Sequence, residues 1–194
     1  MTAGVHSTLP GNPTQSFART EGIEAMKALI VYESMFGNTE DIAQAIAKGI
    51  GETVEVEVAE VSRAPASPQV PMIVAGGPTH AFSMSRPNTR ADAIKQGAQP
   101  GREGVGLREW LQALPSGHHD DRLVTFDTRV AKARRLPGSA AKSAAKIARR
   151  HGYATETAES FYVHDVSGPL LTGEVERAEA WGRHLGASLA RVAR

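Results

Sequence analysis

From residue 26 onward, short apolar runs alternate with longer amphipathic segments along the chain. The first run, residues 28–32, is apolar at every position, as expected for a strand that helices cover on both sides. The segment 38–49 carries isoleucines four residues apart, a spacing typical of a helix that buries one face. This alternation predicts a parallel sheet wrapped by helices on both faces, which is an α/β fold.

The rest of the chain continues the pattern. Residues 54–58 alternate valine with polar or small residues, which predicts an edge strand with one solvent-facing side. Further strands are predicted at 72–75, 123–126 and 160–163, the first of them ending at Gly76 and Gly77, and helices at 86–96, 107–114, 137–151 and 172–192. Because crossovers between parallel strands are right-handed, this order predicts a doubly wound sandwich.

Composition narrows the function classes. The chain has 194 residues, a length that suits one domain with a single core. It contains no cysteine, which excludes disulfide scaffolds, iron–sulfur clusters and cysteine-ligated zinc, so redox chemistry would need a bound cofactor. The net charge is +1, which favours neither nucleic acid nor membranes as partners. No apolar stretch approaches the roughly 20 residues of a bilayer span, so we expect a cytoplasmic protein without a membrane span.

Residues 1–25 differ from the rest of the chain. They are rich in Thr, Ser, Gly and Pro and lack the basic and apolar regions of a secretory signal. We therefore expect a flexible N-terminal tail, followed by one domain over residues 26–194. Met26 opens the first predicted strand, so a start codon placed too far upstream is an alternative origin of the tail.

In a doubly wound fold the ligand lies beyond the carboxyl ends of the strands, where the strand order reverses. The first strand is followed by a segment from Ser34 to Thr39 that contains two hydroxyls and a glycine and leads into a helix. Free backbone N–H groups and the positive end of the helix dipole would meet there, which favours a phosphate. The alternative is a plain turn in which Asn38 or Thr39 caps the helix. Neither a Walker A motif nor a dinucleotide-binding glycine pattern is present.

The residues 31–40, V-Y-E-S-M-F-G-N-T-E, resemble the phosphate loop of flavodoxins and related FMN-binding proteins. In that family a Ser/Thr-x-Ser/Thr-Gly-x-Thr motif wraps the FMN phosphate, and the resemblance extends over residues 26 to 192. It implies a flavodoxin-like three-layer sandwich with a five-stranded parallel sheet in the order 2-1-3-4-5, and FMN as the cofactor. By position, the phosphate would be held by Ser34, Met35, Phe36, Gly37, Asn38 and Thr39. Phe36 replaces the middle hydroxyl of the pattern, as an aromatic residue does in related flavodoxin-like quinone reductases.

The resemblance assigns two further segments to the flavin ring. After the third strand, the ring would lie beside Pro78, Thr79, His80, Ala81 and Phe82. His80 or Phe82 could stack on the ring, or Phe82 could simply cover the core in a surface turn. After the fourth strand, the third flavin loop would comprise Asp127, Thr128 and Arg129. The usual aromatic sandwich is missing there, because Trp110 and Trp181 both fall in predicted helices.

Two polar segments have alternative interpretations. Residues 129–150 contain eight basic residues and no acidic one, which indicates either a solvated helix face or a docking surface for an acidic redox partner. The segment from His118 to Asp121 has the composition of a metal site but lacks a second spaced cluster, so a solvated loop is expected.

The resemblance therefore implies an FMN-binding redox protein. It would act in electron transfer or as a small flavin oxidoreductase with a quinone-like or porphyrin-like acceptor. Its partners would be a redox protein or a small quinone-like molecule, with NAD(P)H as a candidate donor. The alternative is a binding or regulatory module that keeps the fold without flavin.

Overall fold

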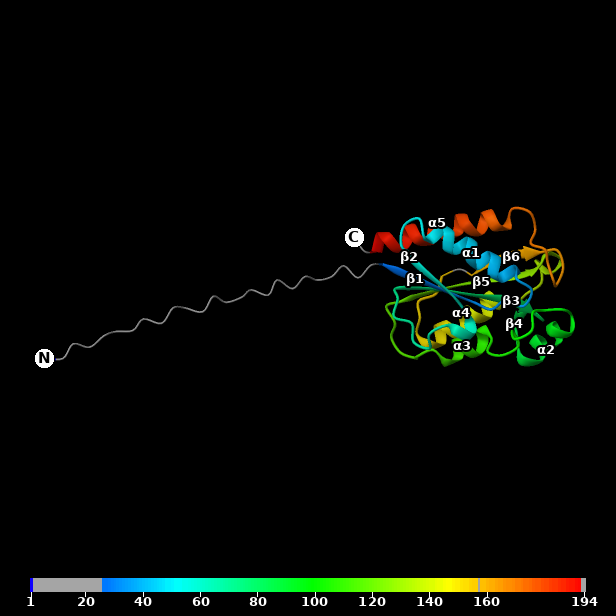
Figure 1. Ribbon diagram of the computed structural model, residues 1–194, viewed down its shortest axis with the longest axis horizontal. Coiled ribbons are helices and arrows are strands. Elements are labelled where there is room, and N and C mark those ends of the chain that lie inside the picture. The colour runs from blue at the N-terminus through cyan, green and yellow to red at the C-terminus, as the bar shows by residue number, and fades with distance from the viewer. Residues whose placement is uncertain (2–25, 157, 193–194) are drawn as a thin grey trace.

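Five parallel strands form the central sheet, in the order β2-β1-β3-β5-β6 (Figure 1). Their bounds are Lys27–Tyr32 for β1, Glu55–Glu60 for β2, Met72–His80 for β3, Arg122–Val130 for β5 and Glu159–Val163 for β6. The two-residue strand β4, Ser83–Met84, pairs antiparallel with the end of β3. The computed structural model describes Met1 and residues 26–156 and 158–192, so the predicted tail lies, apart from Met1, outside the described residues. The order confirms the predicted sheet, with β4 as an addition.

Helices cover both faces of this sheet. One face carries α1, Asn38–Ile50, and α5, Glu174–Val192, and the other carries α3, Leu107–Ala113, and α4, Ala140–His151 (Figure 1). The helix α2, Pro87–Lys95, lies beside β4 at the end where the strands finish. The short 3-10 turns η1, Val61–Arg63, and η2, Ala131–Ala133, follow β2 and β5. No described helix is long and apolar enough to cross a membrane.

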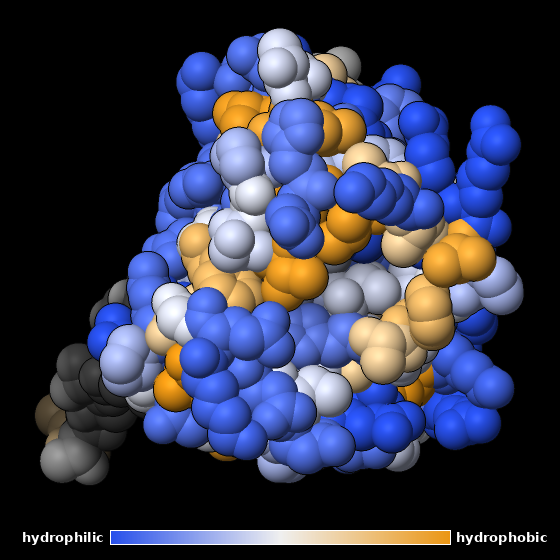
Figure 2. Space-filling view, turned by 90° about the vertical axis from the view of Figure 1, so that its right-hand side faces the viewer, coloured by the Kyte–Doolittle hydropathy of each residue, from blue (hydrophilic) through white to orange (hydrophobic). Residues whose placement is uncertain are grey.

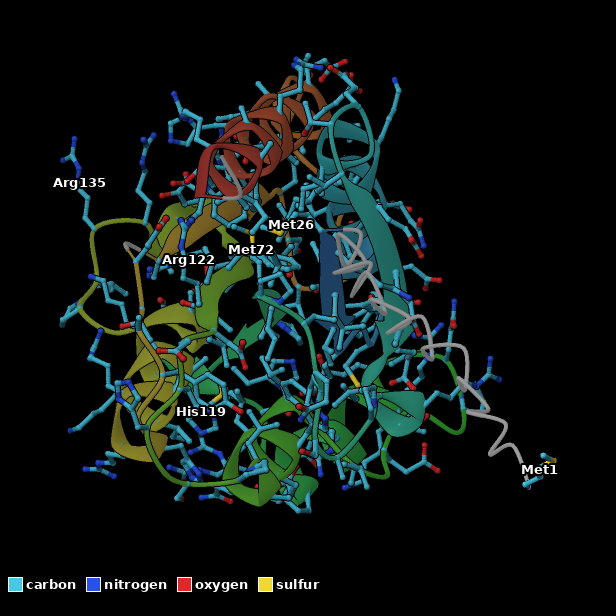
Figure 3. The ribbon with its side chains drawn as sticks, turned by 90° about the vertical axis from the view of Figure 1, so that its left-hand side faces the viewer. Met1, Met26, Met72, His119, Arg122 and Arg135 are labelled. Atoms are coloured by element: carbon cyan, nitrogen blue, oxygen red, sulfur yellow. The ribbon has the colours of Figure 1, made fainter. Side chains whose placement is uncertain are left out.

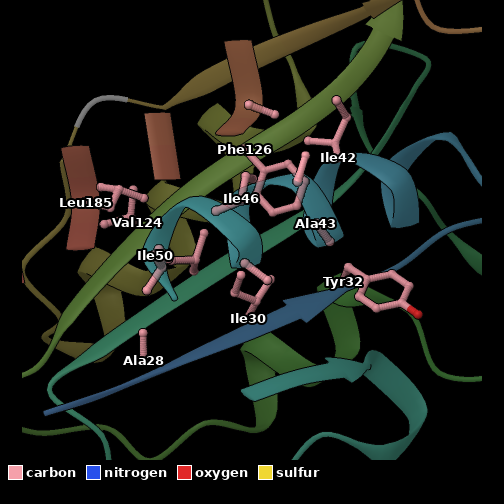
Figure 4. Close-up of a cluster of buried hydrophobic side chains, with 14 of the residues drawn as sticks. Ala28, Ile30, Tyr32, Ile42, Ala43, Ile46, Ile50, Val124, Phe126 and Leu185 are labelled. Atoms are coloured by element: carbon pink, nitrogen blue, oxygen red, sulfur yellow. The ribbon is translucent and has the colours of Figure 1, made fainter. Parts of the chain in front are cut away.

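The isoleucine stripe of α1 fills the space between the sheet and α5. Ile42, Ile46 and Ile50 have no exposed surface and pack with side chains of β1, β5 and α5 (Figure 4). The two helices approach closely at glycines, because a Cβ on Gly49 would collide with the Glu179 carbonyl oxygen and one on Gly182 with that of Ile46. On the other face, five alanines of α4 are buried, so this helix packs on the sheet through small side chains.

Two strands run past the ends that the sequence predicts. The glycines at 76 and 77 do not end β3, which continues to His80. A Cβ on Gly76 would collide with the ring of Phe126 on β5, so this glycine permits close packing of neighbouring strands and makes no turn. Likewise β5 continues through Asp127, Thr128 and Arg129 to Val130. The predicted loop assignments for 76–80 and 127–129 were therefore wrong.

The start of α4 was also predicted too early. The helix begins at Ala140 and not at Pro137, because Gly138 has a positive φ of 88° and Ser139 is extended as the N-cap. The Ser139 hydroxyl accepts a hydrogen bond from the Lys142 amide at 3.2 Å. The edge position of β2 and its alternating exposure are as predicted.

Candidate functional site

The loop between β1 and α1 is closed by the side chain of Ser34. Its hydroxyl oxygen accepts hydrogen bonds from the Gly37 amide at 3.1 Å and from the Glu40 amide at 3.3 Å. Gly37 is the N-cap of α1 and has a φ of 93°, a backbone conformation that favours glycine. The N-cap residue has no side chain to cap the helix, and Ser34 from the preceding loop satisfies the Glu40 amide instead, so neither Asn38 nor Thr39 is the cap that the alternative interpretation required.

Several backbone amides of this loop remain free to bind a ligand. Within the described residues, the N–H groups of Met35, Phe36, Asn38 and Thr39 donate no hydrogen bond to the protein. Around Gly37, no described heavy atom lies within 4 Å of the place where a Cβ would stand. Amides at the N-terminus of a helix attract anions through their partial charge. The loop therefore offers an anion a set of donors that the protein does not use.

The two ends of the site are joined by a pair of threonine hydroxyls. Thr39 at the start of α1 and Thr128 on β5 are buried, and their Oγ1 atoms lie 2.7 Å apart. Only one of the two hydroxyls can donate to the other, so the second proton is available to another acceptor. If Thr128 donates to Thr39, the Thr39 hydroxyl can donate to an anion held by the loop.

A pocket of about 60 Å³ opens beside this pair at the carboxyl ends of β1, β3, β5 and β6. It is lined by Ser34, Met35, Phe36, Asn38, Thr39, Pro78, Thr79, His80, Thr128, Arg129, Val130, Val163 and Val166. A second pocket of about 300 Å³ shares Thr79, His80 and Val166 with it and extends along α2. The structure thus brings the predicted residues of all three segments together, except that neither Gly37, Ala81, Phe82 nor Asp127 lines the first pocket.

Two predicted ring residues also hold the N-terminus of α4. The Thr79 hydroxyl accepts a hydrogen bond from the Ala140 amide at 2.8 Å, and Asp127 Oδ2 accepts one from the Ala141 amide at 2.9 Å. Asp127 has no exposed surface, and its Oδ1 atom has no partner among the described residues. The carboxylate lies at the positive end of the helix dipole, which stabilises a negative charge. Asp127 is therefore an anchor for α4 beside the pocket.

Arg129 also binds the backbone that follows its own strand. Its side chain is buried, and Nη2 donates to the carbonyl oxygens of Ala133 and, at 3.3 Å, of Leu136. Its Nε atom is buried and has no partner in the described part of the chain. Arg129 is thus a residue of the first pocket whose guanidinium holds the segment 131–136 in place.

The turn after β3 carries the predicted stacking residues. Ala81 and Phe82 have positive φ values of 45° and 64° and connect β3 to β4. Phe82 is 51% exposed at the tip of this turn, so it covers no core. His80 lines both pockets, and burial lowers its pKa, with a further contribution from the positive charge of Arg90. Its imidazole is consequently neutral near pH 7.

A buried polar network connects the end of β1 to α2 and α3. Glu33 Oε2 accepts a hydrogen bond from the Leu107 amide at 2.7 Å, and burial raises the pKa of this carboxyl group. Arg90 donates to Ser85 at 3.0 Å and forms an ion pair with Glu109 at 3.1 Å. These contacts join the loop between β1 and α1, called here the phosphate-type loop, to α2 and α3. The chain segment between β4 and β5 therefore shapes the site.

The sequence prediction missed three valines of the pocket wall. Val130 and Val163 end β5 and β6, and Val166 lies in the loop that follows. Val163 is the last residue of the predicted strand 160–163 and could have been included, whereas Val130 lies four residues beyond the predicted end of its strand. Met35, a predicted phosphate residue, lines the first pocket, and its side chain packs with Ala93 and Ala98.

The two tryptophans and the histidine segment considered in the sequence analysis lie outside the pockets and make structural contacts. Trp110 is in α3 and donates to the Pro65 carbonyl oxygen at 3.0 Å, whereas Trp181 is in α5 and packs on Phe126. His119, of the predicted solvated loop, stacks on the ring of Tyr153 with centroids 3.8 Å apart.

The fold and the site together define a class of protein. A five-stranded parallel sheet in this order, with a free helix N-terminus after the first strand and a pocket at the point where the order reverses, is the arrangement of flavodoxin-like domains. The family model for flavodoxin matches residues 30–83, which include the end of β1, the loop after it and β3.

Solved structures agree with this class. A flavodoxin from the domain Archaea is 18% identical, with a TM-score of 0.57 over 84% of this chain and 99% of that one. Oxidised flavodoxin 1 from Bacillus cereus is 19% identical, with a TM-score of 0.58 over 85% and 97%. A flavone reductase is 14% identical, with a TM-score of 0.55 over 86% of this chain and 64% of that protein. No curated protein matches the chain. The chain thus has a flavodoxin-like fold, as its sequence resemblance implies.

Proposed function

We propose that this chain binds FMN non-covalently and acts as a redox protein. The observation that carries the proposal is the unused set of amides between Met35 and Thr39, which stands at the reversal point of a flavodoxin-like sheet. A phosphate monoester would receive several charge-assisted hydrogen bonds there, each contributing about 1.5–3 kcal/mol. The residues present therefore fit the phosphate end of FMN.

The ring end of the site fits a flat group that is only partly enclosed. The second pocket begins at Thr79 and His80, next to the phosphate-type loop, and is open toward α2. A neutral His80 can donate or accept one hydrogen bond from a ring edge without bringing a second positive charge. Arg129 supplies the positive charge of this wall. A bound flavin would provide the electron-accepting group that the side chains of this chain lack.

Two uses of such a site are compatible with the geometry. The protein would be a carrier for a redox partner protein, or a small oxidoreductase that reduces a quinone-like or porphyrin-like acceptor with NAD(P)H as the electron donor. NAD(P)H oxidation by the FMN-loaded protein, with and without a soluble quinone, distinguishes the two uses.

The test of the proposal is a comparison of two flavins. FMN and riboflavin are titrated into the purified protein, and flavin fluorescence and absorbance report binding. FMN should bind at least tenfold more tightly than riboflavin, which lacks the phosphate. Equal affinities for FMN and riboflavin would refute the assignment of the phosphate to the loop between β1 and α1. Colourless protein that takes up neither flavin would favour the alternative, a module that keeps the fold without flavin.

Matched variants test which hydroxyl faces the phosphate. Thr39→Val should weaken FMN binding about tenfold and leave riboflavin nearly unchanged, because it removes a donor to the phosphate. Thr128→Val removes the partner hydroxyl on β5 but no direct donor, so its effect on FMN should be smaller. If both variants lose the same affinity for both flavins, the threonine pair is only structural.

A further inference from the structure

Three large apolar side chains are exposed around the mouth of the two pockets. They come from different segments: Phe82 from the turn after β3, Leu136 from the segment after β5, and Val166 from the loop after β6, with exposed fractions of 51%, 47% and 53%. The turn and the segment after β5 touch, since a Cβ on Gly138 would come within 2.6 Å of the Phe82 carbonyl oxygen. Figure 2 views this end of the molecule and shows apolar surface gathered among hydrophilic side chains.

One side of this mouth is strongly positive. Lys132, Arg134 and Arg135 are exposed on the segment that Arg129 holds in place, and none of the three forms an ion pair within the described residues. Arg135 extends away from the body of the molecule (Figure 3). Arg134 lies over the ring of Tyr162, 5.2 Å from its centroid. The exposed carboxylate of Asp165 stands next to Val166 and accepts a hydrogen bond from the Val166 amide.

We infer that this rim, formed by Phe82, Leu136, Val166, Lys132, Arg134 and Arg135, docks an acidic redox protein. The inference rests on the proposed function, because the rim surrounds the pockets through which electrons would leave a bound flavin. An apolar centre beside a charged border is the usual anatomy of a protein interface. Uncompensated cations raise the association rate with an acidic surface and reject a basic one. Small interfaces of this kind suit the transient complexes of electron transfer.

The charge pattern does not favour nucleic acid as the occupant. Strands of nucleic acid bind to grooves in which aromatic side chains alternate with cations. In the described part of the rim, Phe82 is the only exposed aromatic residue. An acidic protein needs only the apolar centre and the positive border that are present.

Binding to two small redox proteins of opposite charge tests the inference. An acidic plant-type ferredoxin and the basic cytochrome c are titrated by calorimetry into the full chain, with and without FMN. At about 20 mM salt ferredoxin should bind and cytochrome c should not, and about 300 mM salt should weaken ferredoxin binding at least tenfold. A preference for cytochrome c, or affinity that does not respond to salt, overturns the inference.

A matched pair of variants locates the contact. Lys132→Gln, Arg134→Gln and Arg135→Gln together remove three charges at the rim and should lower ferredoxin affinity about tenfold. Lys146→Gln, Arg149→Gln and Arg150→Gln remove three charges from the second half of α4, roughly 9–15 Å along the helix from its start, and should lower it less than twofold. Leu136→Ser should weaken binding about threefold at either salt concentration, because it acts through apolar contact. If the two triple variants lose the same ferredoxin affinity, the effect depends only on the net charge of the protein, and a contact at the rim is refuted.

Two results separate this inference from the proposed function. If FMN binds but ferredoxin does not, the docking surface is wrong and the flavin site stands. If ferredoxin binds in a salt-dependent way but neither flavin binds, the surface stands and the flavin proposal falls. If a single-stranded oligonucleotide of about 20 thymidines binds more tightly than ferredoxin and the rim variant abolishes that binding, the occupant is nucleic acid and the inference is overturned.

Discussion

Replacing Thr79 by valine should separate a structural role from a cofactor role at one residue. The Thr79 hydroxyl accepts the Ala140 amide at 2.8 Å, and Ala140 at the start of α4 has no exposed surface. Valine has nearly the same shape but no acceptor, so the variant leaves a buried N–H without a partner. Such a loss costs about 1–3 kcal/mol. For a domain of this size that corresponds to a fall in Tm of about 2–10 °C.

The assay is urea unfolding of the flavin-free protein, because a bound ligand would add its own stabilisation. Thr79→Ser keeps the acceptor and loses one methyl group, so it should recover most of the stability, to within about 1 kcal/mol. FMN affinity of the valine variant should change less than about threefold, because the role assigned to this hydroxyl is to accept the Ala140 amide. Its own proton has no partner among the described residues, so a larger loss would show that it donates to the flavin. A variant with unchanged unfolding free energy and a large loss of FMN affinity would refute this reasoning and assign the hydroxyl to the flavin.

Three more variants have defined outcomes. Gly49→Ala should lower the free energy of unfolding in urea by about 3 kcal/mol or more, because the added Cβ would collide with the Glu179 carbonyl oxygen between α1 and α5. An unfolding midpoint equal to that of the wild type would show that the two helices can move apart without cost. The pKa of His80 is lower in the folded protein than the ordinary 6.5, so the His80 contribution to the unfolding free energy should be fully present above pH 6.5 and should be lost as the pH falls toward the folded pKa. The loss should be about 1.4 kcal/mol for each unit by which the pKa is lowered, and His80→Gln should abolish it. Identical pH profiles of stability for wild type and variant would contradict this. Arg129→Gln should lower the two-electron midpoint potential of the FMN-loaded protein by about 30 mV, equal to about 1.4 kcal/mol, whereas the exposed Arg134→Gln should not; coinciding potentials of wild type and Arg129→Gln would place the guanidinium charge away from the ring.

The class of fold was predictable because the spacing of apolar residues along the sequence shows which faces of each strand and helix are buried. A strand covered on both sides must be apolar throughout, as 28–32 is, and a helix that packs on a sheet must repeat its apolar residues every three or four positions, as 38–50 does. The position of the phosphate-type loop follows from the same logic, since a loop between a central strand and its helix can only stand at the carboxyl edge of the sheet.

The ends of the strands were not predictable, because their signals depend on neighbours far away in the sequence. Gly76 looks like the end of a strand, and only the ring of Phe126 on β5 explains why it stays inside the sheet. Asp127 and Arg129 look like polar loop residues. They are buried in β5 because an amide of α4 and carbonyl oxygens of the segment after β5 compensate them.

The sequence by itself determined the layers, the strand order through its family resemblance, and the free helix N-terminus, because each depends on local pattern and on general rules of chain connection. Only the tertiary structure decided which candidate side chains face the pocket and which serve the fold. Thr79 and Asp127 turn out to hold α4, and Thr39 meets Thr128 across 89 positions of sequence. The physical reason is that a polar group taken out of water must find a partner in space, and that partner is chosen by the packing of the whole domain.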